Sequence, residues 1–134
     1  MAKPSKSTMT NKLDKLFSRI VRSKGYCVKC GKAEHDKLQC CHIFSRTYRS
    51  VRWDFDNVLC LCASCHFLGH RNPVLFTEFV KGYLGEFRYE NLKLKAIPTK
   101  KWRLGDMISY YEELKKMEEG ATAYDNQPKG IKND

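Results

Sequence analysis

The stretch between residues 38 and 70 holds five of the seven cysteines and three of the four histidines of the chain. Thiolate sulfur and imidazole nitrogen are preferred ligands of Zn²⁺, and a neutral imidazole can also accept a proton near pH 7. Three arginines, Arg46, Arg49 and Arg52, lie in the same stretch, and guanidinium groups bind phosphates in a bidentate manner. These residue types suit two kinds of chemistry, metal binding and proton transfer at a phosphate ester.

The most specific metal-binding pattern is a pair of Cys-x2-Cys spacings, Cys27 with Cys30 and Cys62 with Cys65. Two such turns can surround one tetrahedral Zn²⁺ with four thiolates, which is a closed structural site. The 31 residues between the two pairs exceed the usual zinc-finger spacing, so we expect a substructure inserted between them. Bound zinc would also add folding free energy to a small domain that has a limited core.

Two alternatives to the four-cysteine site stay open at this point. A rival zinc set combines the first cysteine pair with His66 and His70, but it leaves the second pair without a role. The cysteines could also be small buried hydrophobic residues that bind nothing.

The elements that must position these side chains follow from the hydrophobic pattern. The segments "LQCCHIF" and "NVLCL" are predicted to be short strands joined by a polar loop over residues 45–56. If the strands pair antiparallel with residue numbers summing to 100, Cys40 lies opposite Cys60. We favour reduced, packed thiols for this pair over a redox-sensitive disulfide. A short helix should begin near Cys62 and end before Pro73, because the residue before a proline avoids helical geometry.

Further helices are predicted on both sides of this segment. Apolar residues at helical spacing favour one helix over residues 11–24, one that is capped by Asn72, and one through "YENLKLKAI". A last helix, "GDMISYYEELKKMEEG", should be capped by Asp106 and end at Gly120. We expect residues 1–9 to be flexible and residues 121–134 to be a disordered tail. The expected apolar face of the helix after Asn72 comprises Val74, Leu75, Phe79, Val80 and Tyr83.

The net charge of +10 is concentrated in the first half of the chain. Residues 1–53 contain 13 Lys and Arg against 3 Asp and Glu, and residues 54–134 contain 12 of each kind. A localised positive field favours a polyanionic partner, because each neutralised phosphate releases counterions. The predicted DNA contacts are Lys15, Arg19 and Arg22 on the first helix and Arg46, Arg49 and Arg52 in the loop. A second basic strip, either a flanking contact or solvated charge, comprises Lys93, Lys95, Lys100, Lys101 and Arg103.

The chain has no run of 18 apolar residues, and its start, "MAKPSKSTMT", lacks the apolar segment of a secretory signal. We therefore expect a cytoplasmic protein with no membrane partner. In a reducing compartment, paired cysteines favour metal binding over disulfides.

The two cysteine pairs enclose His42, then Asn57 after 14 intervening residues, then His66 after eight more. Together with the segments "CCHIFSR", "RWDFDN", "LCASCH" and "HRNP", this pattern resembles HNH endonucleases of the ββα-metal type. The similarity covers about residues 25–80 and is greatest to the small zinc-stapled versions of bacteriophages.

The resemblance implies a fold and a set of roles. The fold would be α+β, a mostly helical single domain over residues 10–120 around a ββα-metal core at about residues 38–72. His42 would be the general base, Asn57 would brace the loop and orient that base, and His66 would bind a catalytic divalent cation such as Mg²⁺, Mn²⁺, Ni²⁺ or Zn²⁺.

One position departs from the common pattern of that family. The residue before the base is often an aspartate or histidine that also binds the catalytic ion, whereas this chain has Cys41. A thiolate suits softer ions than Mg²⁺. His70 falls on the same helical face as His66 and is a further candidate ligand.

The resemblance thus implies a monomeric, phage-encoded, metal-dependent endonuclease that nicks or cuts DNA with little sequence specificity in the host cell. The products would carry 5′-phosphate and 3′-hydroxyl ends. The alternatives are a non-catalytic zinc-stapled DNA-binding module, an RNA-directed nuclease, or an accessory factor in recombination or beside phage packaging proteins (terminase).

Overall fold

The computed structural model describes residues 2–33, 37–98 and 100–120 of the 134. In these residues a two-stranded antiparallel sheet is combined with five α-helices, so the predicted α+β, mostly helical class is confirmed at that level. His35 and the predicted tail, residues 121–134, lie outside the described part. The elements are α1 (Lys6–Arg22), β1 (Leu38–His42), η2 (Arg49–Val51), η3 (Phe55–Asn57), β2 (Val58–Cys62), α2 (Ala63–Arg71), α3 (Pro73–Leu84), α4 (Glu86–Ala96) and α5 (Leu104–Glu119).

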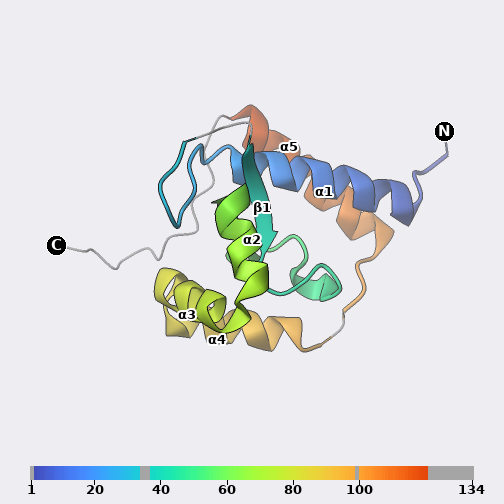
Figure 1. The fold of residues 1–134 in the computed structure, drawn as a ribbon. Helices are drawn as coiled ribbons and strands as arrows, with labels where there is room; N and C mark the ends of the chain where they lie inside the picture. Colours follow the sequence, from blue (N-terminus) through green and yellow to red (C-terminus); the bar gives the residue numbers. More distant parts are fainter. Residues whose placement is uncertain (1, 34–36, 99, 121–134) are drawn as a thin grey trace.

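The β-hairpin is the centre of the arrangement. Cys40 pairs with Cys60 and His42 pairs with Val58, which confirms the predicted register. All five residues of β2 are buried, and α1 and α2 each contact both strands. Figure 1 shows α1 and α5 side by side at the top and α3 and α4 at the bottom, with β1 and α2 between them. The hairpin therefore links two helical layers.

Helix α1 begins at Lys6, five residues before the predicted start. The Ser5 hydroxyl accepts a hydrogen bond from the Thr8 backbone N–H at 3.1 Å and so caps the helix. Met9 extends the apolar stripe by one turn and is buried. Residues 6–9, which we expected to be flexible, thus belong to α1. The buried stripe of this helix comprises Met9, Leu13, Leu16, Phe17, Ile20 and Val21.

The boundaries of the later helices agree with the prediction more closely than their capping residues and buried faces do. The Asn72 side chain caps α3 as expected, but Val74 and Leu75 are 70% and 57% exposed, so the prediction of a core position for these two residues is wrong. The buried positions of α3 are Val80 and Leu84, one turn apart, and α4 packs on the same helix.

Helix α5 ends at Glu119, and Gly120 is its C-cap, as predicted. Its N-cap is Arg103 instead of Asp106, which lies inside the first turn, where a carboxylate interacts favourably with the helix dipole. Within the described ranges, no helix has the length and apolar character needed to cross a membrane.

Phe17 offers a test of the core between α1 and the hairpin. Its ring is 1% exposed and lies 4.7 Å from that of Phe55, so Phe17→Ala should lower the free energy of unfolding by about 3–5 kcal/mol. Phe87 on α4 is 80% exposed, and Phe87→Ala should change the free energy of unfolding by less than about 0.5 kcal/mol. Denaturant unfolding with zinc present measures both, and equal losses would contradict this placement of Phe17.

Candidate functional site

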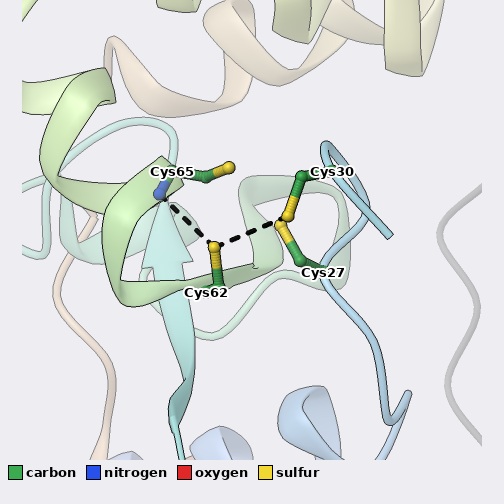
Figure 2. Close-up of side chains that lie close together, drawn as sticks. All are labelled: Cys27, Cys30, Cys62 and Cys65. Atoms are coloured by element: carbon green, nitrogen blue, oxygen red, sulfur yellow. Dashed lines mark hydrogen bonds between the residues drawn. The ribbon is translucent and has the colours of Figure 1, made fainter. Parts of the chain in front are cut away.

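The four cysteines of the two Cys-x2-Cys pairs converge on one point. Cys27 and Cys30 lie on a tight turn after α1, where Gly31 adopts a φ of +82° and donates its N–H to the Cys27 carbonyl at 2.8 Å. Cys62 ends β2, and its sulfur accepts the Cys65 backbone N–H at the start of α2. The four sulfur atoms all lie within 4.8 Å of one another (Figure 2).

The donor set fits zinc. A tetrahedral site with Zn–S bonds near 2.3 Å places the sulfurs about 3.8 Å apart, and the sulfurs of Cys30 and Cys62 are 3.7 Å apart. These four side chains could therefore hold a structural Zn²⁺ ion. In the described residues, the cluster consists of the four cysteines and not of the rival set with two histidines.

The electrostatics of the cluster also favour a bound cation. Burial raises the pKa of the Cys27 thiol, but hydrogen bonds from the Cys30, Cys62 and Lys29 backbone outweigh it and lower the pKa to about 7. The pKa of Cys65 is instead raised, by burial and by its three sulfur neighbours. Four crowded thiols cannot all ionise without a compensating positive charge, which a metal ion supplies.

A cleft of about 590 Å³ lies beside the hairpin, between α1, β1, α2 and the start of α3. It is lined by five of the predicted site residues, together with Asp14, which was not among them. The remaining predicted catalytic residue, Asn57, is fully buried and does not line the cleft. The predicted residues in the lining are Cys41, His42, Arg46, His66 and His70, and Cys40 also contributes.

His42 ends β1, and its ring is held by the backbone of the following loop. Its Nε2 atom lies 2.9 Å from the Arg52 carbonyl oxygen. Because a carbonyl only accepts, Nε2 carries the proton and Nδ1 keeps a lone pair. Burial lowers the pKa of His42 below its usual value of 6.5, so the ring is neutral at pH 7.

His66 lies on α2 across the cleft. Its Nδ1 atom is 2.6 Å from the Gln39 side-chain oxygen of β1, which leaves Nε2 with the free lone pair. A hydrogen bond of this kind to the distal nitrogen is typical of metal-binding histidines. Burial, and then the nearby His70, lower the pKa of His66. The two rings are 4.9 Å apart, so both could face one cation.

Both the amide nitrogen and the oxygen of the Asn57 side chain form hydrogen bonds with the loop between the strands. Its amide nitrogen donates to the carbonyls of Phe44 and Val51, at 2.9 and 3.0 Å, and its oxygen accepts the Phe44 N–H at 2.7 Å. The backbone adds a 2.7 Å bond from the Ile43 N–H to the Asn57 carbonyl. Asn57 therefore fixes the loop that holds His42.

Cys41 is 3% exposed, and burial raises its pKa to about 12. At neutral pH it is an uncharged thiol, which is a poor ligand for a hard cation. Apart from the four cysteines, no further group of three or more Cys, His, Asp or Glu side chains comes together tightly in the described ranges.

Asp14 of α1 is the residue of the cleft that sequence reasoning missed. Its carboxylate accepts hydrogen bonds from Arg52 at 2.6 and 3.0 Å and from the Trp53 indole at 2.9 Å, and Arg46 lies 3.8 Å away. Burial raises the pKa of Asp14, but these partners outweigh it and leave the pKa lowered. The one feature of the sequence that could have pointed to Asp14 is that residues 1–53 contain only three acidic residues, of which it is one.

The residues predicted to contact DNA differ in their exposure and in the side chains that they bind within the protein. Arg46 and Arg52 both form an ion pair with Asp14, but the Arg46 side chain is 61% exposed at the cleft and the Arg52 side chain is 20% exposed. On α1, Arg19 pairs with Glu118 of α5. The Arg22 side chain bonds to Ser18, and Lys15, Arg19 and Arg22 line one shallow hollow on the surface.

Cys40 and Cys60 face each other in the sheet, and both are free thiols. Burial is the main cause that raises their pKa values, to about 12 and about 11. Neutral thiols are slow to oxidise, because the thiolate is the reactive form.

No family model, no curated protein and no solved structure matches this chain.

The four-cysteine site predicts about one zinc per chain in purified protein. Cys30 is exposed, so Cys30→Ser removes a ligand with little change in packing, yet it should release the zinc and lower the free energy of unfolding by several kcal/mol. Cys40→Ser, outside the cluster, should retain the zinc. Elemental analysis and thermal melting measure both effects, and stoichiometric zinc in Cys30→Ser would contradict the site.

Proposed function

We propose that the protein is a metal-dependent endonuclease of the HNH type that hydrolyses phosphodiester bonds in DNA. The observation that carries the proposal is that His42 and His66 line the same cleft. Each ring has one nitrogen engaged by an oxygen acceptor, which leaves a lone pair on the other. The chain order β1, β2, α2 supports the resemblance to the ββα-metal core.

His42 is suited to be the general base. Its Nδ1 lone pair can take a proton from the attacking water, and the ring is neutral before the reaction because burial lowers its pKa. When Nδ1 becomes protonated, the Arg52 carbonyl oxygen stabilises the positive ring through Nε2. Asn57 holds the loop that carries this carbonyl.

His66, with His70 beside it, is suited to hold the divalent cation that this chemistry needs. When bound, such an ion supplies positive charge to the phosphate and to the leaving oxygen. Two imidazoles would leave the remaining ligand positions to water and phosphate oxygens, and imidazole suits Ni²⁺ or Zn²⁺ better than Mg²⁺. Gln39 orients His66 through the 2.6 Å contact with Nδ1.

The basic half of the chain would dock the DNA backbone. Arg46 is the one exposed Lys or Arg side chain in the described lining of the cleft that holds His42 and His66, so it would bind a phosphate close to the bond that is cut. No set of side chains in the loop suggests a code for reading bases, so we expect weak sequence preference and, by analogy with the family, 5′-phosphate and 3′-hydroxyl ends.

A non-catalytic zinc-stapled DNA-binding module is the second candidate. The four-cysteine cluster and the concentrated positive charge favour it as much as they favour a nuclease. It gives no role, however, to two oriented imidazoles in one cleft.

His42→Ala separates the two candidates. Loss of a general base should slow the cutting or nicking of supercoiled plasmid by about 10²–10⁴-fold, with Mg²⁺, Mn²⁺, Ni²⁺ or Zn²⁺ as the added ion. Gel retardation of DNA and the zinc content should stay at wild-type levels. A parallel loss of retardation would instead assign His42 a folding role.

The cleavage rate should depend on pH through His42. Only the neutral ring can accept a proton, so the rate should be flat above pH 6.5 and fall about tenfold per pH unit below the lowered pKa of His42. The charge of Arg46 contributes to that lowered pKa, so Arg46→Ala should move the acidic limb of the profile to higher pH. An acidic limb that does not move in Arg46→Ala would contradict this assignment.

A further inference from the structure

A second cavity, of about 260 Å³, opens on the other side of the loop that follows β1. Three segments far apart in the sequence form it: the first turns of α1, the loop around η2, and the chain just before α5. Its lining contains four cationic side chains and no carboxylate, a composition that favours an anionic ligand. The four cations are Lys6, Arg49, Arg52 and Lys101.

The walls of this cavity are fixed by packing and hydrogen bonds. The indole N–H of Trp102 donates to the Arg49 carbonyl at 2.9 Å. The Trp53 and Trp102 rings meet edge to face with their centres 5.1 Å apart, and Trp53 is 4% exposed. The lysines are exposed at the rim, so the cavity combines a rigid base with mobile cations.

The positive charge of this cavity comes mainly from Lys6, Arg49 and Lys101, which are all exposed. Arg52 is neutralised by Asp14, which lies on the side of the first cleft. Lys6 adds its charge to the N-terminal turn of the 17-residue helix α1, where the helix dipole is itself positive. Lys6 and Lys101 lie on different segments of the lining, so both can contribute charge to one bound phosphate group.

The loop over residues 45–56 separates the two cavities. Arg46 lines the first cleft, while Arg49 and Arg52 line the second cavity. The hydrogen bond from His42 to the Arg52 carbonyl connects the catalytic histidine to the same loop. A nucleic acid strand that lies across this loop would therefore meet His42 on one side and the second cavity on the other.

We propose that the second cavity binds a backbone phosphate of the DNA at a position away from the bond that is cut. The inference rests on the proposed nuclease function, and it adds a second place on the protein at which the same DNA substrate is bound. The contact is to the backbone, so it strengthens binding without adding sequence preference.

The test is the double variant Lys6→Ala/Lys101→Ala, placed in a His42→Ala background so that the DNA stays intact. One lost phosphate contact should reduce the slope of log affinity against log salt by about 0.9. Lys32→Ala/Lys116→Ala is the matched control, since it removes the same charge from exposed lysines that line neither cavity. The control should keep the slope of its parent.

Intrinsic fluorescence gives a second and independent readout, because Trp53 and Trp102 are the two tryptophans of the chain and both line this cavity. Titration with a DNA duplex should change the emission of the parent and of the control, and the change should be lost in Lys6→Ala/Lys101→Ala. Inorganic pyrophosphate serves as the comparison ligand.

The outcomes separate this inference from the proposed function. If the wild-type protein neither retards nor cuts DNA, both are contradicted. If it cuts DNA but the two double variants share one salt slope, the second cavity is not a DNA contact. A fluorescence response to pyrophosphate with none to DNA would assign the cavity to free phosphate and overturn the inference.

Discussion

Four sulfur atoms within 4.8 Å of one another are the constraint on which the other features of the structure depend. They join the turn after α1 to the junction between β2 and α2, although 31 residues lie between the two cysteine pairs in the chain. The same turn donates the Val28 N–H to the Cys60 carbonyl at 2.9 Å, so it also covers the outer edge of β2. A cation that neutralises these thiolates would thus fix the angle between the hairpin and α2. That angle places His66 across the cleft from His42.

The loop between the strands is the second organising element, and it depends on two polar anchors. Asn57 satisfies three backbone groups from within, while Asp14 holds Arg52 and Trp53 from the side of α1. A buried amide with every bond satisfied specifies one conformation, because any other arrangement leaves polar groups unpaired. The loop can therefore present His42 to one cavity and cations to another without rearranging.

Local patterns in the sequence were enough to predict the cysteine cluster, the strand register and the junction at Asn72 and Pro73, because spacing and turn chemistry encode these features directly. The start of α1 was missed because its first turn is polar apart from Met9. The exposure of Val74 follows from how α4 packs on α3, which no local period reveals. The role of Asp14 depends on a partner 38 residues away, and the second cavity depends on three distant segments, so neither leaves a motif.

X-ray absorption at the zinc edge of the purified protein is the most direct measurement of the constraint that organises this structure. Four sulfur ligands at about 2.3 Å are the predicted first coordination shell. A shell that contains imidazole nitrogen would contradict the four-thiolate site. Protein that folds with its hairpin intact and holds no zinc would also contradict it, together with the placement of His42 and His66 that follows from that site.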